Sequence, residues 1–265
     1  VGLSFLTNRL LDEDIVYSSM DNEVATVDEN GVITAVGEGT TYIKVKDQNN
    51  EVTNAIKVSV TIKNNETQPK VVGGGYYFAA LKGNGTVYTW GYNGSGQLGL
   101  GDTNNRTEPT QTNMKAVIDI AAGTDHTLVL KADGTVWATG LNNYGQLGNG
   151  TTENTNTFQQ VKLNENGDYL ENIVSIAAGY TASYAVTAEG EVYGWGRNDD
   201  GGLGIGSKSS EINELYPVKM KKVSKIIQIA AGANHAIMLD ADGNVWSTGY
   251  NSSGQLGIGN TDIQV

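Results

Sequence analysis

From residue 71 onward, apolar and polar positions repeat in a fixed order along the chain. An apolar run ending in small residues comes first, as in "VIDIAAG" at 117–123 and "IIQIAAG" at 226–232. Two alternating segments follow, as in "TLVLKADGTVWATG", and a glycine-containing turn separates them. Alternation with period two predicts half-buried strands, and a short Gly turn between two such strands predicts a hairpin. We therefore predict antiparallel hairpins with turns at Asn84-Gly85, Asp133-Gly134, Glu189-Gly190 and Asp242-Gly243.

Each repeat closes with a glycine-rich element of the pattern G-x-N-x-x-G-(Q/G)-L-G-x-G, first seen in "WGYNGSGQLGLG" at 90–101. Its leading glycines, at Gly91, Gly140, Gly196 and Gly249, recur about every 50 residues, which is the period of a repeat architecture. We expect its glycines and asparagines to adopt positive φ, and its leucines to anchor the irregular segment in the core. Those leucines are Leu98, Leu147, Leu203 and Leu256. The small-residue steps fit a crowded place near a central axis, so each repeat is predicted to be one blade of a β-propeller.

These repeats resemble the regulator of chromosome condensation family. The resemblance is carried by "AAGTDHTLVLKADGTVWATGLNNYGQLGNG" at 121–150 and by "AAGANHAIMLDADGNVWSTGYNSSGQLGIG" at 230–259, and it covers residues 71–265. Tyr77 and Ala182 stand where the family pattern has histidine. The resemblance implies a seven-bladed propeller. The chain holds four repeats, so we expect an incomplete ring truncated at its end.

Residues 1–63 differ from the repeats and consist of short β-branched runs separated by Asp, Asn and Gly. One face of the segment 42–46 is apolar and the other is charged, which predicts a half-buried strand in a small β-sandwich. The stretch "YSSMDNEVATVDENGVITAVGEGTTYIKV" resembles the bacterial immunoglobulin-like group 2 domain, whereas the opening 14 residues match it poorly. We predict an all-β chain with an immunoglobulin-like domain at 1–63, a linker at 64–70 and propeller repeats at 71–265.

Composition excludes several classes of function. The net charge is −12, and a nucleic-acid-binding protein needs a basic surface to displace counterions from phosphates. Cysteine is absent, which excludes disulfides, zinc–thiolate sites and cysteine nucleophiles. No stretch approaches the roughly 20 apolar residues that cross a bilayer as a helix. We expect neither nucleic-acid binding nor membrane insertion.

Candidate residues for chemistry are few. His126 and His235 are the two histidines, and both occupy the slot that Tyr77 and Ala182 fill in the other repeats, which favours a structural role. The segment "DADGN" at 240–244 starts like a calcium loop but has Asn251 where an EF-hand needs glutamate. The glycine-rich elements lack the lysine and the helix of a phosphate-binding loop. We predict no catalytic residue, no metal and no cofactor, and therefore a protein that is not an enzyme.

Several tyrosines and polar residues fall in loop slots, either after a small-residue step or inside W-G-x-N. Tyrosine offers a rigid amphipathic contact surface and is enriched at interfaces, although local loop packing would also explain it. The predicted partner-binding residues are Tyr76, Tyr77, Tyr92, Asp125, Tyr180, Arg197, Asn234 and Tyr250.

The sequence thus favours a non-enzymatic protein–protein interaction or adhesion module of a modular bacterial secreted or cell-surface protein. Its partner is an unknown protein, and open propeller ends also allow self-association. The alternatives are a purely structural stalk, an inhibitor of a secreted enzyme, and a guanine-nucleotide exchange factor-like role, the last implied by the family resemblance.

Overall fold

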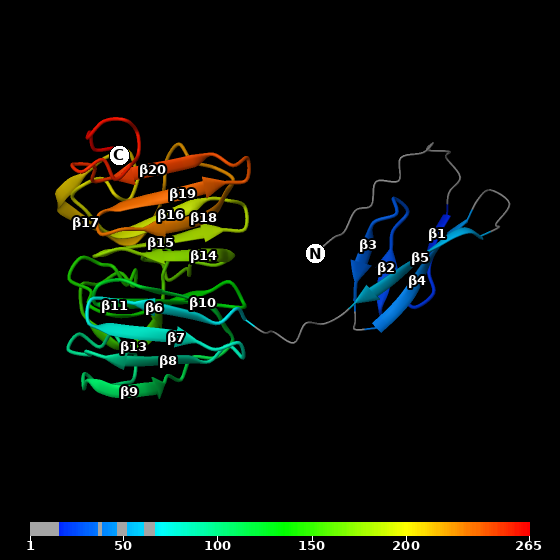
Figure 1. Ribbon diagram of the computed structural model, residues 1–265, viewed down its shortest axis with the longest axis horizontal. Helices are drawn as coiled ribbons and strands as arrows, with labels where there is room; N and C mark the ends of the chain where they lie inside the picture. Colours follow the sequence, from blue (N-terminus) through cyan, green and yellow to red (C-terminus); the bar gives the residue numbers. More distant parts are fainter. Residues whose placement is uncertain (1–15, 37–38, 47–51, 61–66) are drawn as a thin grey trace. The chain divides into compact units, whose positions relative to one another are not determined.

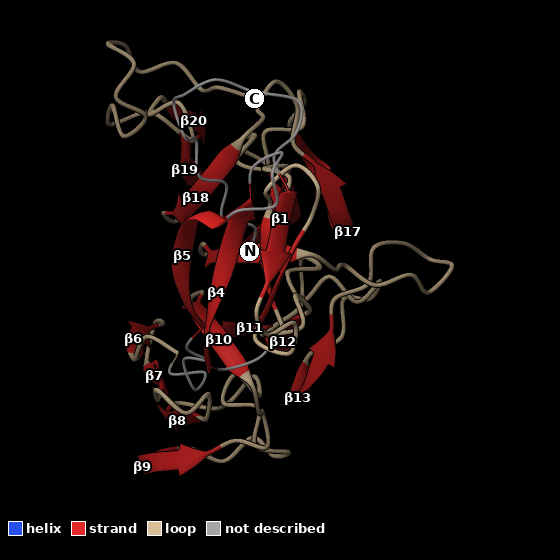
Figure 2. Ribbon diagram, turned by 90° about the vertical axis from the view of Figure 1, so that its right-hand side faces the viewer, coloured by secondary structure: helices blue, strands red, loops and turns tan. Residues whose placement is uncertain are grey.

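The computed structural model describes residues 16–36, 39–46, 52–60 and 67–265, and these form strands, turns and loops without a helix (Figure 2). The prediction of an all-β chain is confirmed. The chain divides into two compact units, an N-terminal unit of Val1–Asn65 and a C-terminal unit of Glu66–Val265.

The N-terminal unit contains one sheet of three strands and one of two strands in its described part. In the larger sheet, β4 lies between β1 and β5, and all pairings are antiparallel. Ala25, Ile33 and Ile43 form a small buried core. The opening segment that matches poorly lies outside the described residues. The strands are β1 (Val16–Ser19), β2 (Ala25–Val27), β3 (Ile33–Ala35), β4 (Gly39–Lys46) and β5 (Val52–Val60).

The C-terminal unit contains four antiparallel sheets in its described part, and the strand order in each sheet follows the chain (Figure 1). The first sheet comprises β6 (Lys70–Gly73), β7 (Tyr77–Leu81), β8 (Val87–Gly91) and β9 (Arg106–Gln111). The second comprises β10 (Val117–Ala122), β11 (His126–Lys131), β12 (Val136–Gly140) and β13 (Thr155–Gln160). The third comprises β14 (Ile173–Ala178), β15 (Ala182–Thr187), β16 (Val192–Asn198) and β17 (Ser209–Lys219). The fourth comprises β18 (Ile226–Ala231), β19 (His235–Asp240) and β20 (Val245–Gly249).

The hairpin turns lie where the sequence predicts them. In each turn the glycine N–H donates to the carbonyl three residues earlier, as Gly85 does to Lys82 and Gly134 does to Lys131. The four turn glycines have φ between +76° and +87°, a region that disfavours any residue with a Cβ. The glycine within each turn therefore fixes the hairpin register in all four sheets.

Hydrophobic cores lie between consecutive sheets. We call the face of a sheet that contacts the next sheet along the chain its leading face, and the opposite face its trailing face. The leading-face residues are Ala79 and Leu81 in the first sheet, Leu128 and Leu130 in the second, and Tyr184 and Val186 in the third. They pack on trailing-face residues, which are Ile120 and Val129, then Ile176 and Ala185, then Ile229 and Met238. The four leucines of the glycine-rich elements are buried, with Leu256 the most accessible at 6% exposure, as predicted.

The small-residue steps of the four sheets line one groove of about 310 Å³. A Cβ on Gly74 would lie 2.6 Å from the Gly123 carbonyl oxygen, and a Cβ on Gly123 would lie 2.7 Å from that of Gly179. Gly179 stands in the same relation to Gly232, at 2.6 Å. Successive sheets approach too closely here for any side chain, which confirms the predicted crowded axis.

Residues 67–70, expected to be linker, belong to the C-terminal unit. Thr67 is buried; its N–H donates to the Gly83 carbonyl at 2.8 Å and its hydroxyl donates to the Val117 carbonyl at 3.1 Å. Strand β6 then begins at Lys70. The segment is polar, as a linker would be, but its polar groups form hydrogen bonds with the first two sheets.

Candidate protein-interaction surface

One buried asparagine organises each glycine-rich connector. Its Oδ1 accepts the N–H of the leucine five residues later at 2.9–3.1 Å, and its Nδ2 donates to the carbonyl nine residues later at 2.9–3.0 Å. These asparagines are Asn93, Asn142, Asn198 and Asn251, and none of them has a positive φ. The expectation that asparagine supplies left-handed backbone was therefore wrong. Glycines take those conformations, and the asparagine closes the loop through its side chain.

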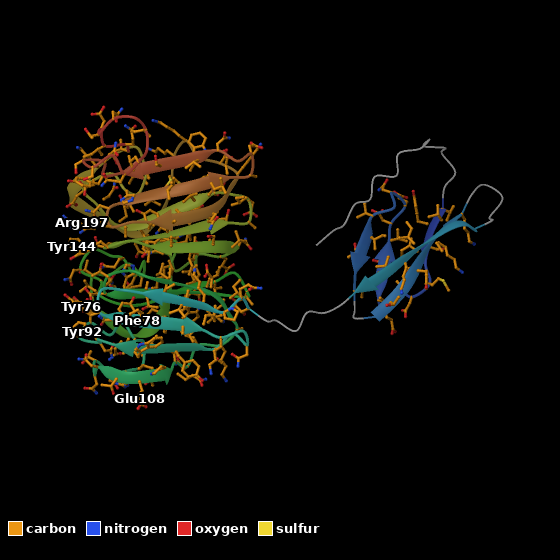
Figure 3. All side chains as sticks on the ribbon, in the orientation of Figure 1. Tyr76, Phe78, Tyr92, Glu108, Tyr144 and Arg197 are labelled. Atoms are coloured by element: carbon orange, nitrogen blue, oxygen red, sulfur yellow. The ribbon has the colours of Figure 1, made fainter. Side chains whose placement is uncertain are left out.

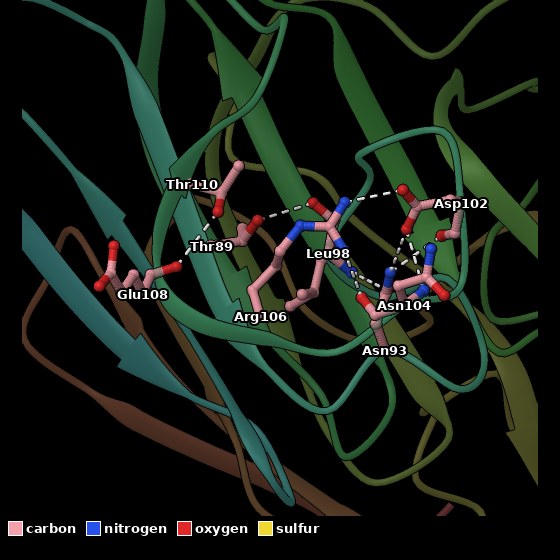
Figure 4. Close-up of polar contacts among 8 residues, drawn as sticks. All are labelled: Thr89, Asn93, Leu98, Asp102, Asn104, Arg106, Glu108 and Thr110. Atoms are coloured by element: carbon pink, nitrogen blue, oxygen red, sulfur yellow. Dashed lines mark hydrogen bonds and ion pairs between the residues drawn. The ribbon is translucent and has the colours of Figure 1, made fainter.

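Further polar contacts hold the first connector (Figure 4). The backbone carbonyl of Asp102 accepts a hydrogen bond from the Asn93 amide, and its carboxylate forms an ion pair with Arg106 at 2.7 Å. The Arg106 guanidinium, by its hydrogen bond, holds the pKa of the Asp102 carboxyl below its usual value. Thr89 in β8 donates to the Leu98 carbonyl at 2.8 Å. The connector is thus tied at several points and presents its outward residues from a fixed backbone.

The two kinds of loop slot lie at the same end of the C-terminal unit. In each repeat the residue inside G-x-N donates its backbone N–H to the second residue after the small-residue step, as Tyr92 does to Tyr76 at 2.9 Å and Tyr250 does to Asn234 at 3.0 Å. Leu141 and Arg197 make the same bond in the second and third repeats. Figure 3 shows Tyr76, Tyr92, Tyr144 and Arg197 along one end of the sheets. We call this end, formed by both slots of every repeat, the connector end.

Four of the predicted tyrosines are exposed at the connector end. Tyr76 is 82% exposed, Tyr180 52%, Tyr92 44% and Tyr250 37%. The Tyr92 hydroxyl lies against Gly94, and Gly94 lines a polar groove of about 400 Å³ together with Ser95. Tyr180 lies on the wall of the axial groove. The connector end therefore carries exposed tyrosine side chains beside two grooves.

The prediction that Tyr77 contacts a partner was wrong, because Tyr77 is fully buried. It begins strand β7, and its phenol donates to the His126 carbonyl while accepting from the Thr127 hydroxyl. Burial raises the pKa of this phenol. Tyr77 therefore fastens the first sheet to the second, as His126 of the same slot fastens the second to the third.

The predicted residue Arg197 belongs to a charged cluster between the second and third repeats, and the sequence did not single out its partners Tyr144 and Asp199. The guanidinium of Arg197 lies over the ring of Tyr144, 5.1 Å from its centroid, and its Nε donates to Asp199 Oδ2 at 2.7 Å. This hydrogen bond to Asp199 raises the pKa of the guanidinium. Tyr144 stands where the first and fourth repeats have Ser95 and Ser253. A tyrosine in a serine slot was the available signal.

The remaining predicted residues, Asp125, Arg197 and Asn234, are half-buried. Gln97 of the first connector donates to Asp125 Oδ1 at 3.0 Å, which joins the first and second repeats. Partial burial raises the pKa of the Asp125 carboxyl. Both signs of charge are therefore present on the connector end beside the exposed rings.

His126 and the calcium-like loop hold the fold together. His126 is fully buried, with Nε2 3.0 Å from the Ser183 hydroxyl of the third sheet, and desolvation lowers the pKa of its imidazole to about 4. The Asp240 carboxylate accepts hydrogen bonds from the backbone and side chain of Asn244 and from the Trp246 indole. Asp240 thus caps a hairpin turn. Within residues 16–36, 39–46, 52–60 and 67–265, no three His, Cys, Asp or Glu side chains are grouped so that they could hold a metal ion.

The described segments contain no helix that is long and apolar enough to cross a membrane.

Together, the up-and-down sheets, the axial small-residue steps and the asparagine-closed connectors define a β-propeller built from repeats. The particular family is the RCC1-like domain, to which this chain belongs, since the family model matches residues 8–265. That range includes most of the N-terminal unit as well as the four repeats.

Individual relatives are similar over part of their length. Ultraviolet-B receptor UVR8 of Arabidopsis thaliana is 31% identical over 191 residues, which is 70% of this chain and 42% of the receptor. E3 ubiquitin-protein ligase HERC2 of Homo sapiens is 34% identical over 190 residues, 71% of this chain and 3% of the ligase. The chain thus spans less than half of either relative.

Solved structures show the same fold. The yeast RCC1 protein Prp20, in its crystal structure bound to Kap60, superposes with a TM-score of 0.64 at 22% identity and covers 91% of this chain and 57% of Prp20. Human WBSCR16 superposes with a TM-score of 0.64 at 23% identity, covering 86% of this chain and 64% of WBSCR16.

Proposed function

We propose that the C-terminal unit is a non-enzymatic protein-binding module and that the connector end is its binding surface. The observation that carries this proposal is the set of four exposed tyrosines on one end of the unit. Tyrosine and arginine dominate the energetics of many interfaces. Tyrosine does so because it buries much area with only two rotatable side-chain bonds. The hydrogen-bonded connectors keep these side chains on an ordered backbone, which lowers the entropy lost on binding.

The relatives support a protein partner. A structural study of Prp20 from Saccharomyces cerevisiae describes its binding properties to Gsp1p and histones. UVR8 is a receptor by name, and another relative, 38% identical over 111 residues, is the X-linked retinitis pigmentosa GTPase regulator of Homo sapiens. The net charge of −12 is unsuited to a chromatin surface, so we favour a protein partner that does not depend on nucleic acid.

The proposal extends to the N-terminal unit and to the location of the protein. We assign the N-terminal unit to an immunoglobulin-like spacer on the strength of its short antiparallel strands and the sequence resemblance at 15–63. Acidic, cysteine-free chains with this pair of modules suit a bacterial secreted or cell-surface protein, so we place the protein outside the cell. Neither the spacer nor the propeller needs catalysis to fulfil this role.

The test is capture of one partner by wild-type protein and by two tyrosine variants. Tyr92→Ala and Tyr250→Ala should each reduce affinity for that partner about 5- to 30-fold, since truncating a central interface tyrosine costs about 1–2 kcal/mol. Tyr169→Ala is the control, because Tyr169 has the same 44% exposure as Tyr92 but lies in the connection at 162–172. Equal binding by all variants, or loss only with Tyr169→Ala, would remove the connector end as the site. A nucleotide-release assay on a small GTPase tests the exchange-factor alternative directly.

A further inference from the structure

A polar groove of about 400 Å³ lies where the first connector meets strand β13 of the second sheet. We call it the junction groove. Both of its walls come from repeats whose sheets contain all four strands. The side chains that line it include Ser95 and Thr103 of the connector and Asn156, Thr157 and Gln159 of β13.

The corresponding space between the second and third repeats is filled by side chains. The third repeat has two bulky residues in the slots of Asn156 and Thr157, namely Leu215 and Tyr216. The Tyr216 ring lies against Gly150, whereas a Cβ on Gly101, the corresponding glycine of the first connector, would meet no atom within 4 Å. The junction groove is therefore open because short polar residues replace the bulky residues of the next repeat.

The junction groove is lined by uncharged groups that can form hydrogen bonds. Within the described part of the chain, the hydroxyls of Ser95 and Thr103 and the side-chain amide of Asn156 have no hydrogen-bond partner. Gln159 donates to the Thr157 hydroxyl at 3.0 Å, which leaves the Gln159 side-chain carbonyl able to accept. An ionic ligand would lose its hydration here without meeting an opposite charge, because no charged side chain is among the described residues that line the groove. These groups fit a neutral ligand with many hydroxyls.

Tyr92 adds a ring at the connector end of the groove. It lies against Gly94, which lines the groove, and it is 44% exposed (Figure 3). A tyrosine presents an apolar ring and a polar hydroxyl. A pyranose ring likewise combines C–H faces with a rim of hydroxyls, so the two can pack face to face. An extended peptide would also offer uncharged donors and acceptors, but its apolar side chains would find no apolar pocket in the described lining.

We propose that the junction groove binds a neutral oligosaccharide. The amides of Asn156 and Gln159 form hydrogen bonds with sugar hydroxyls, and one sugar ring packs on Tyr92. The volume of about 400 Å³ lies within the range of small-molecule sites, which suits a short segment of a sugar chain. This activity goes beyond the proposed protein binding and shares only Tyr92 with it.

Titration calorimetry of the 265-residue chain with cellotetraose, maltotetraose and N-acetylated chitotetraose tests the proposal. At least one of these sugars should bind with a Kd of about 1 mM or lower. Asn156→Leu and Thr157→Tyr introduce the side chains of the next repeat and should abolish this binding, because they fill the groove. Asn143→Leu is the matched control: Asn143 is an exposed asparagine of the second connector, outside the groove, and its variant should bind the sugar like wild type.

Two tyrosine variants separate sugar binding from protein binding. Tyr92→Ala should weaken sugar binding about fivefold or more, whereas Tyr250→Ala should leave it unchanged because Tyr250 does not line the groove. Asn156→Leu and Thr157→Tyr keep all four exposed tyrosines, so they should still capture a protein partner. The sugar site and the proposed protein-binding surface can therefore fail independently.

Three outcomes would overturn the proposal. One is the absence of binding by all three sugars up to about 10 mM. Another is sugar binding that survives both groove-filling variants, because the site would then lie elsewhere. The third is binding of an asparagine- and threonine-rich peptide, but of no sugar, that Asn156→Leu abolishes, which would assign the groove to a peptide. Asn156→Ala removes the amide without filling the groove, and it replaces either filling variant if the thermal midpoint shows that variant to be unfolded.

Discussion

Replacing Asn142 should destabilise the C-terminal unit more than any exposed polar substitution nearby. Asn142 is fully buried, and its Oδ1 accepts the Leu147 N–H at 2.9 Å. Its Nδ2 donates to the carbonyls of Thr151 at 2.9 Å and Glu153 at 3.1 Å. The two carbonyls belong to exposed residues and can recover a bond from water, whereas the Leu147 N–H is buried and cannot.

The magnitude follows from that difference. Leaving a buried donor without a partner costs about 1–3 kcal/mol, and losing the amide donors adds about 1 kcal/mol, so Asn142→Ala should cost about 2–4 kcal/mol. Asn143→Ala is the control; Asn143 is exposed, and its substitution should change stability by less than about 0.5 kcal/mol. All four tryptophans lie in the C-terminal unit, so their fluorescence during urea unfolding reports on this unit alone.

Two further variants separate hydrogen bonding from space filling. Asn142→Leu fills the volume but offers no polar atom, and it should be as unstable as Asn142→Ala. Asn142→Asp keeps the acceptor for Leu147 but directs a carboxylate at two carbonyl oxygens, so it should be no milder. If leucine restored the urea midpoint, the side chain would matter for its volume and not for the hydrogen bonds that close the connector.

Two other predictions concern the interfaces between sheets. Gly179→Ala should destabilise the unit by about 1–3 kcal/mol, because the new Cβ would lie 2.6 Å from the Gly232 carbonyl oxygen. Gly83→Ala is the control and should be close to neutral, because the nearest atom to its new Cβ lies at 3.4 Å. Equal urea midpoints for the two variants would contradict the crowded axis. His126 has a folded-state pKa of about 4, below its usual 6.5, so it is neutral in both states above pH 6.5, and only the unfolded chain gains a proton between pH 6.5 and 4. Its contribution to stability should therefore fall by about 3 kcal/mol over that window, and His126→Gln should show a correspondingly shallower loss of stability with acid. Parallel pH profiles for wild type and His126→Gln would show that the buried imidazole does not set this slope.

Much of the C-terminal unit was predictable because backbone geometry selects the same residue type in every repeat. The turn glycines, the buried connector leucines and the axial small residues are each fixed by a steric requirement that recurs four times. Glycine at Gly85 and at Gly134 reflects positive φ, and glycine at Gly123 reflects the adjacent carbonyl of Gly179. A requirement of this kind leaves a periodic signal that one sequence suffices to show.

The errors arose where a side chain acts across a distance that the sequence does not display. The connector asparagines looked like residues chosen for left-handed backbone, because asparagine and glycine share that preference. Their partners lie five and nine residues away, as Leu98 and Asp102 do from Asn93. Tyr77 looked like part of a tyrosine-rich loop, yet it shares the slot of His126, which the sequence already indicated to be structural. The slot, not the residue type, was the better guide to burial.

The same comparison of slots separates stability from recognition in this chain. Slots that keep one residue type in every repeat, such as the connector asparagine and leucine, face inward and carry the hydrogen bonds and cores between sheets. The G-x-N slot instead holds tyrosine, leucine, arginine and tyrosine, and these residues share one hydrogen bond, donated by the backbone N–H, which any of them can make. The side-chain contacts of this slot, such as those of Arg197 with Asp199 and Tyr144, stay at the connector end, so exchanging these side chains should alter that end without disturbing the sheets. This arrangement explains why Tyr92→Ala and Tyr250→Ala should change binding while leaving the free energy of unfolding within about 0.5 kcal/mol of wild type. Substitution of the adjacent asparagine should instead lower the free energy of unfolding.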